Sequence, residues 1–274
     1  MPIDVASYLK FTPTDNTGSF AADTEGHVYY DDSEASLKHY DGSNWGRVSR
    51  DLTWGITPGY GPYTVDDNTK LLIHSDTTDD NTTFDDSSSS DHTITRSNAL
   101  HKTAQKKIGA TSMYFDGDGD YLSIPDHNDF DWGNAADFTI DFWMKALDDT
   151  ALYPSIISCV TGWGGCKGLI YFDGATEILY FTNIAGMSVQ SNDTLQDSVW
   201  HHIACIRDST VFKMYVDGVA QSDTDSGQYD FDISVGGMTI GKNSWNGEDG
   251  ELKGYLDEIR FSNIARWTSN FTVY

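Results

Sequence analysis

Two stretches decide the fold: YFDGDGDYLSIP at residues 114–125 and GYLDEIRF at residues 254–261. The first contains a strand by its alternation, since Leu122 and Ile124 share one face. Counting by twos places Asp120 on that same face, so we expect its carboxylate to point inward.

The second stretch places an acid in a similar position. Tyr255, Ile259 and Phe261 share one face of the predicted strand, and Asp257 falls on that face with them. Unpaired burial of a charge costs several kcal/mol or forces protonation. An inward carboxylate therefore needs a cation, an arginine or backbone N–H groups as its partner.

Short alternating segments continue through most of the chain. We expect strands at Lys70–His74, Asp91–Thr95, Phe138–Lys145, Leu169–Phe172, Ile178–Phe181, Trp200–Arg207, Val211–Val216, Met238–Ile240 and Tyr255–Phe261. Residues 76–90 are mostly Asp, Thr and Ser and predict a loop, and Asp217-Gly218 predicts a tight hairpin. Many short strands separated by turns indicate an all-β sandwich or jelly roll.

Five motifs follow one another in order over residues 68–274. They are Phe115-Asp116-Gly117 with Asp120-Tyr121-Leu122, Asp137–Trp143, Trp200–Ala204, Tyr215–Gly218 and Gly254–Arg260. Their order and spacing resemble the laminin-G-like, concanavalin A-like jelly roll. The resemblance implies an antiparallel two-sheet sandwich, often with a structural calcium near one rim and a ligand surface in its loops. It implies no activity, because one fold hosts many functions.

Two further stretches resemble proteins of tailed bacteriophages. Residues 262–272 are similar to the C-terminal segment of jelly-roll domains in phage virion proteins. Residues 26–45 are similar to small repeats of phage tail fibres. The resemblance implies a virion surface protein, on tail or capsid, that displays a lectin-like domain for attachment to a host surface or glycan. A purely structural decoration protein and a glycan-degrading enzyme remain as alternatives.

Residues 1–67 differ in sequence pattern from the jelly-roll domain that we expect at residues 68–274. They contain one predicted β-hairpin, at residues 24–45, and then a stretch rich in glycine and proline. A single hairpin is only marginally stable by itself. We therefore expect an anchoring or oligomerising region that contacts other virion proteins and makes a homo-oligomer, with a trimer favoured because phage fibres are commonly trimeric.

Composition excludes some partners. The 274 residues include 17 Lys and Arg against 42 Asp and Glu, a formal charge of −25, so nucleic acid is not an expected partner. We expect neither a membrane span nor a signal peptide, since long apolar runs and a basic start are missing. Cys159 and Cys166 could close a small loop as a disulfide, which the sequence leaves open, while Cys205 indicates a buried thiol.

The candidate metal ligands are carboxylates of the two organising stretches, namely Asp116, Asp120 and Asp257. An EF-hand is excluded, because Tyr121 stands where that loop needs glycine and His127 stands where it needs an acid. A structural Ca²⁺ remains an expectation, since this hard cation takes six to eight oxygen ligands. The alternative is a solvated Asp-Gly turn, with Asp257 accepting hydrogen bonds from Arg260 or a backbone amide.

The candidate carbohydrate-binding residues are Trp163, Asn243 and Trp245, which lie in segments rich in glycine or asparagine. Exposed loop tryptophans beside amides suit the apolar face and the hydroxyls of a sugar. The alternative is that these rings cap the sandwich or meet a neighbouring subunit.

We expect no catalysis. The Glu-x-Asp-x-x-Glu run of related glucanases is missing, and the adjacent Asp257 and Glu258 point to opposite faces of a regular strand. No serine or cysteine lies in a nucleophile elbow. His201 and His202, next to Trp200, are more typical of packed residues than of a general base.

Overall fold

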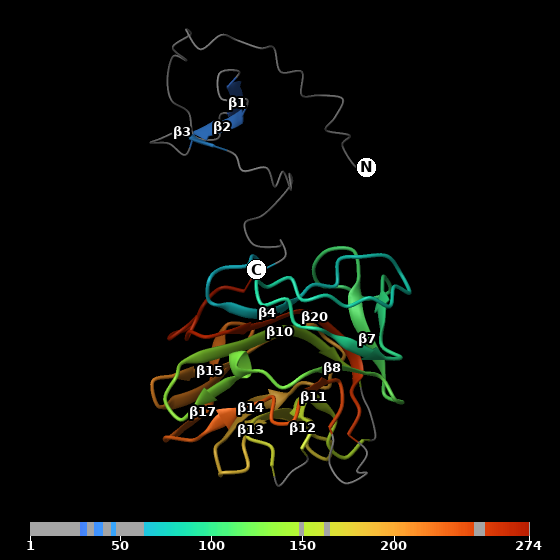
Figure 1. Ribbon diagram of the computed structural model, residues 1–274, viewed down its shortest axis with the longest axis vertical. Helices are drawn as coiled ribbons and strands as arrows, with labels where there is room; N and C mark the ends of the chain where they lie inside the picture. Colours follow the sequence, from blue (N-terminus) through green and yellow to red (C-terminus); the bar gives the residue numbers. More distant parts are fainter. Residues whose placement is uncertain are drawn as a thin grey trace. The chain divides into compact units, whose positions relative to one another are not determined.

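The computed structural model describes residues 63–147, 151–161, 165–243 and 250–273, together with the backbone of three short strands near the N-terminus (Figure 1). None of the helices in this described part has the length and apolar character needed to cross a membrane.

The chain divides into two compact units, Met1–Thr57 and Pro58–Tyr274. The expected boundary at residues 67 and 68 falls inside the second unit. Tyr63 and Asp66 belong to that unit because their side chains bond to His202 and Arg266.

The first unit contains a small antiparallel sheet of β1 (Val28–Asp31), β2 (Ser36–Tyr40) and β3 (Trp45–Arg47). Val28 pairs with His39 and Asp31 with Ser36, which confirms the predicted hairpin. The strand β3 extends it by pairing with β2.

The second unit is a sandwich of two antiparallel sheets, drawn as an upper and a lower layer in Figure 1. The eight-stranded sheet has the order β17 (Val219–Ser226), β16 (Val211–Val216), β15 (His201–Asp208), β10 (Phe138–Ala146), β20 (Lys253–Ser262), β7 (Ser112–Asp116) and β6 (Leu100–Lys102), with β4 (Thr69–Ile73) also pairing with β20. The seven-stranded sheet has the order β14 (Ser188–Thr194), β13 (Ile178–Thr182), β12 (Leu169–Asp173), β11 (Ser155–Cys159), β19 (Met238–Ile240), β8 (Tyr121–Ile124) and β5 (Thr95–Ser97). A 3₁₀ turn, η2 (Asn128–Phe130), leads into a small ribbon of β9 (Asp131–Gly133) and β18 (Phe231–Asp232). The predicted all-β jelly-roll sandwich is confirmed.

The core lies between the sheets. Phe138, Ile140, Phe142 and Met144 of β10 all belong to it, as their alternation predicts. Burying each such side chain contributes about 1.5–3 kcal/mol, so the inward faces of the strands supply most of the driving force for folding.

Most predicted strands are confirmed to within a few residues, but the strand expected at Asp91–Thr95 is wrong, because β5 begins only at Thr95. The preceding backbone is held by side chains instead: the amide of His92 donates to the Asp86 carboxylate at 2.9 Å. The polar strands β14 and β17 were not predicted, since neither has an apolar face of the kind that β10 has.

These two polar strands join the edges of the two sheets. The backbone amides of Ser188 and Gln190 in β14 donate to the carboxylates of Asp225 and Asp223 in β17, each at 3.0 Å. Acidic side chains thus satisfy backbone groups that an open edge would offer to another chain.

The face assignment predicted for β20 is wrong. Leu256, Ile259 and Phe261 lie in the core, whereas Asp257 leaves it for the outer face of the sheet. A β-bulge is the reason, because Glu258 has a φ of 52° and the register against β10 shifts beside it. A bulge adds one residue and so exchanges the faces on its two sides.

The predicted Asp217-Gly218 turn and the three cysteines all lie among the described residues. Asp217 and Gly218 both have positive φ, as the type I′ turn of a tight hairpin requires. Cys159 and Cys166 form a disulfide. Cys205 is a buried thiol of the core, as expected, and burial raises its pKa well above the ordinary value.

Asp257 is fully buried on the outer face of the eight-stranded sheet. Its Oδ2 atom accepts the backbone N–H groups of Lys107 and Ile108, each at 3.0 Å, and its Oδ1 atom has no hydrogen-bond partner among the described residues. Burial raises the pKa of this carboxyl to about 7. The folded chain therefore holds a proton here at pH values where the unfolded chain has lost it.

This proton makes stability depend on pH. Between the ordinary pKa of 3.8 and the folded pKa of about 7, rising pH favours the unfolded chain, by about 1.4 kcal/mol per pH unit at most. Asp257→Asn keeps an oxygen for both amides and does not titrate. In urea unfolding, the free energy of unfolding of the variant should therefore rise relative to that of the wild type from pH 4 to pH 7, and the difference should stay constant above pH 7. Asp118→Asn, at an exposed carboxylate, is the control, and a gain that is the same at every pH would contradict this account.

Candidate functional site

Asp116 and Asp120 lie together at the turn between β7 and β8. The Oδ2 atom of Asp120 accepts the amide of Asp116 at 2.9 Å, and Oδ1 of Asp116 accepts the amide of Asp118 at 2.8 Å. Burial raises the pKa of Asp120 to about 6. These bonds are the ones that close an Asp-Gly turn, and calcium binding by this pair stays a prediction.

Asp257 is not part of that group. Asp116 pairs with Lys253, so Asp257 lies four residues farther along β20, which corresponds to about 13 Å at the rise of a strand. Its partners are the two backbone amides described above, which is one of the alternatives that the sequence left open. The three predicted calcium ligands therefore do not form one ligand set.

The predicted carbohydrate-binding residues are only partly described. Trp163 and Trp245 lie outside the described residues. Asn243 is buried; its side-chain amide donates to the carbonyl of Tyr153 at 3.0 Å and its backbone N–H to the carbonyl of Gly250 at 3.1 Å. Asn243 thus bonds to two backbone segments, and its part in carbohydrate binding stays a prediction.

A buried polar network covers the outer face of the eight-stranded sheet. Arg260 donates two hydrogen bonds to Asp141, at 2.8 and 3.1 Å, and its guanidinium lies 4.0 Å from the ring centroid of Tyr63. Burial alone would raise the pKa of Asp141, but Arg260 beside it holds that pKa below the ordinary value.

The network continues through His202, whose Nε2 atom lies 2.7 Å from the Tyr63 hydroxyl. Trp267 and Phe271 from the C-terminal tail stack on each other and meet the edge of the His202 ring. Packed polar groups without access for a ligand indicate a structural role, as the sequence predicted for His202.

A polar pocket of about 560 Å³ opens beside β4 and β6. Its lining comes from the residues after β4, from the loop at residues 76–90 and from β6: His74, Asp76, Thr77, Asn81, Thr83, Asp85, Ser87 and His101. Sequence reasoning missed this pocket, since the Asp-, Ser- and Thr-rich segment signals only a loop.

Asp86 shapes the loop that lines the pocket. Its carboxylate is buried and accepts the backbone amides of Leu72, Ser88 and His92 at 3.0, 2.8 and 2.9 Å. Asp85 and Ser87, on either side of it, are exposed. The buried carboxylate thus fixes the two neighbouring side chains at the pocket.

Some lining groups are available to a ligand. The side chains of Thr83, Asp85 and Ser87 make no hydrogen bond to any other described residue, and the carboxylate of Asp76 uses only one oxygen, on the amide of Ala110 at 2.8 Å. Hydroxyls and carboxylate oxygens are the groups that bind polyhydroxylated ligands.

Other lining groups are held by the fold. The Nδ1 atom of His74 lies 2.7 Å from Oε1 of Glu258, the bulge residue of β20, and Oε2 of Glu258 accepts the amide of Tyr63 at 2.6 Å. The bulge therefore orients one wall of the pocket.

His101 forms a pair with Ser75 that has the geometry of a nucleophile and its base. Its Nε2 atom lies 2.8 Å from the carbonyl of Thr83, which can only accept, so Nδ1 accepts the Ser75 hydroxyl at 2.6 Å. Burial lowers the pKa of His101, which favours this neutral form. Ser75, however, is only 1% exposed, so a substrate in the pocket cannot reach its hydroxyl. The pair is structural.

The comparisons with known proteins point to a lectin-like fold. Residues 116–269, more than half of the chain, match the family described as the Concanavalin A-like lectin/glucanases superfamily. No curated protein matches the chain in sequence.

Solved structures with this fold include binding domains of clostridial toxins. The binding domain of Paraclostridial Mosquitocidal Protein 1 has a TM-score of 0.53 and 12% identity, covering 73% of this chain and 49% of that one. A structure of botulinum neurotoxin type C, whose cell entry depends on two ganglioside molecules, has a TM-score of 0.53 and 13% identity, covering 73% and 48%. The binding domain of botulinum neurotoxin DC in complex with SialylT has a TM-score of 0.54 and 13% identity, again covering 73% and 48%.

The present chain spans about half the length of these domains, and identity this low shows a shared fold alone. The two-sheet sandwich and the matched residues agree. The chain belongs to the concanavalin A-like lectin/glucanase superfamily, in its laminin-G-like branch.

Proposed function

We propose that the sandwich is a carbohydrate-binding domain without enzymatic activity, and that the polar pocket beside β4 and β6 is its binding site. The observation that carries the proposal is the group formed by Thr83, Asp85 and Ser87, whose side chains line the pocket without a hydrogen bond to any other described residue. The lectin-like fold and the binding domains that share it support the proposal.

The size and chemistry of the pocket suit a sugar. Its volume of about 560 Å³ lies within the range of about 300–1,000 Å³ typical of small-molecule sites. Sugar hydroxyls both donate and accept, so Asp85 can accept from a hydroxyl while Thr83 and Ser87 donate or accept.

The charge of the pocket favours neutral or amino sugars. Asp76 and Asp85 both line it, and the chain as a whole carries a formal charge of −25. An anionic sugar would meet like charges, which are costly to bring together.

A glycan-degrading enzyme is the second candidate, because the pocket contains two carboxylates. A glycosidase keeps one carboxyl protonated as a general acid by burying it. Asp76 and Asp85 are both exposed, which favours binding over hydrolysis. Release of reducing ends from a bound polysaccharide would reverse that preference.

The biological setting is also a proposal. The resemblance of residues 262–272 and 26–45 to phage virion proteins supports display on a virion surface, with the N-terminal unit contacting other virion proteins. The glycan would then belong to the surface of the host.

The full chain should form a homotrimer through its N-terminal unit, because one three-stranded sheet buries little by itself. Light scattering at micromolar concentration should give three times the mass of one chain. A monomer with an intact N-terminus would contradict this proposal without affecting the proposed sugar site.

A glycan array, probed with the full chain, tests the proposed site. We expect binding to neutral or amino sugars, and Asp85→Ala should weaken it about tenfold or more, because a hydrogen bond to a charged group contributes about 1.5–3 kcal/mol. Ser87→Ala should weaken binding to a smaller extent.

Ser89→Ala is the matched control, since Ser89 is an exposed serine of the same loop outside the pocket. A wild-type chain that binds glycans, with Asp85→Ala and Ser87→Ala binding them equally well, would place the site elsewhere.

A further inference from the structure

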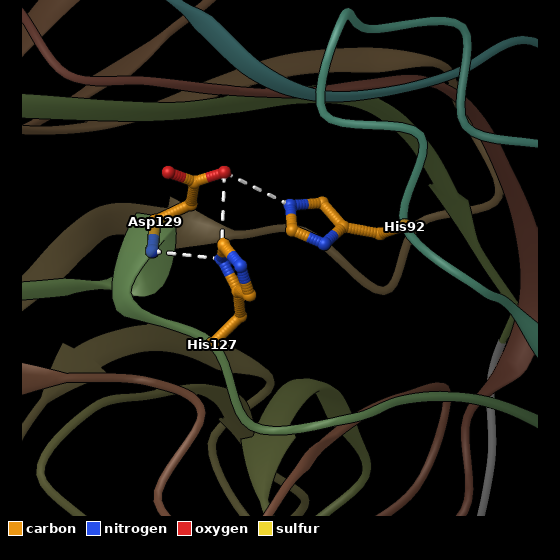
Figure 2. A group of neighbouring side chains, drawn as sticks. All are labelled: His92, His127 and Asp129. Atoms are coloured by element: carbon orange, nitrogen blue, oxygen red, sulfur yellow. Dashed lines mark hydrogen bonds and ion pairs between the residues drawn. The ribbon is translucent and has the colours of Figure 1, made fainter.

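Two histidines and an aspartate meet at the start of η2 (Figure 2). None of the three lines the polar pocket. His92 comes from the end of the loop before β5, and His127 and Asp129 come from the first turn of η2. One ligand atom from each lies within 4.8 Å of the other two.

The two distances to Asp129 fit one tetrahedral ion. Oδ2 of Asp129 lies 3.2 Å from Nε2 of His92 and 3.4 Å from Nδ1 of His127. In a tetrahedron with metal bonds of about 2.0–2.1 Å, neighbouring ligand atoms are about 3.3 Å apart. A cation between these three atoms therefore needs little movement of the two contacts to Asp129.

The hydrogen bonds leave two lone pairs close together. The amide of Asp129 donates to Nδ1 of His127 at 3.1 Å, so this nitrogen is an acceptor and carries no proton. Oδ2 of Asp129, also an acceptor, faces it at 3.4 Å. A cation would relieve this contact, and the 3.1 Å amide bond would be exchanged for a bond to the metal.

The surrounding residues hold two of the ligands in place. The Ser90 hydroxyl donates to Oδ2 of Asp129 at 2.7 Å, and the His92 ring packs against Phe130 at 4.7 Å between centroids. The side chains of His92 and Asp129 are 8% and 24% exposed, whereas that of His127 is 52% exposed. One side of the cluster therefore opens to water, which can supply a fourth ligand.

We propose that His92, His127 and Asp129 bind one divalent ion of the late first transition row, with Zn²⁺ as the reference ion. Imidazole nitrogens suit this class, whereas Ca²⁺ takes oxygen ligands almost exclusively. The ion links His92, two residues beyond the loop at residues 76–90, to η2 and so stabilises the end of the loop that lines the polar pocket. The proposed metal site does not depend on the proposed sugar site.

Calorimetric titration of the metal-free full chain with Zn²⁺ tests the site. We expect a binding step that His127→Ala and Asp129→Ala each weaken more than about tenfold, since loss of outer-shell partners alone costs ten- to a hundredfold. Co²⁺ should give the visible absorption of a tetrahedral complex in the wild type but not in either variant.

His201→Ala is the matched control, because His201 also lies between two carboxylates, at 2.7 Å from Asp217 and 3.2 Å from Asp197, without a second histidine among them. It should bind Zn²⁺ as the wild type does. His127→Ala loses the hydrogen bond from the amide of Asp129, so in chelator it should unfold at a somewhat lower temperature than the wild type. Zn²⁺ should raise the unfolding temperature only in the wild type and in His201→Ala. Wild-type affinity in His127→Ala, or no binding by the wild type, would overturn the proposal.

Discussion

The bulge at Glu258 sits in the middle of β20, the strand that pairs with β4, β7 and β10. Its positive φ exchanges the faces of the strand, so that Asp257 and Arg260, three residues apart, both lie on the outer face while Leu256, Ile259 and Phe261 lie in the core. A regular strand would have buried Asp257 among apolar side chains, at a cost of several kcal/mol. The bulge instead sends the polar side chains to a face where backbone amides and Asp141 receive them.

The bulge also contacts the proposed binding site. Glu258 contacts His74, and His74 forms part of the pocket that we propose as a sugar site. The outer face around Asp141 and His202 is closed by Tyr63 and by the C-terminal tail, whereas the pocket beside β4 and β6 is open to a ligand. Binding sites of this kind, carried by loops on a rigid sandwich, can change ligand without a change of fold.

Much of the sandwich could be predicted from the sequence, because strands such as β10 place a large apolar side chain at every second residue, Phe138, Ile140, Phe142 and Met144. The bulge could not be predicted, since a positive φ at a glutamate has no local signal and is imposed by pairing with β10. The pocket was missed for a related reason: Asp86 organises its loop through the amides of Leu72, Ser88 and His92, bonds that the Asp-, Ser- and Thr-rich composition of the loop does not reveal. The calcium set failed to assemble because Asp257 lies farther along β20 than the Asp-Gly turn, a distance that the two motifs do not reveal.

The location of the sugar site is the claim on which the functional account depends most. Histidine side-chain NMR spectra of the full chain, recorded with and without the glycan that binds best, measure it directly, because His74 and His101 line the pocket while His127 and His201 do not. The account predicts that the resonances of His74 and His101 shift on binding and that those of His127 and His201 stay in place. Unshifted His74 and His101 resonances at saturating glycan would contradict it and would favour a site at the segments that contain Trp163 and Trp245.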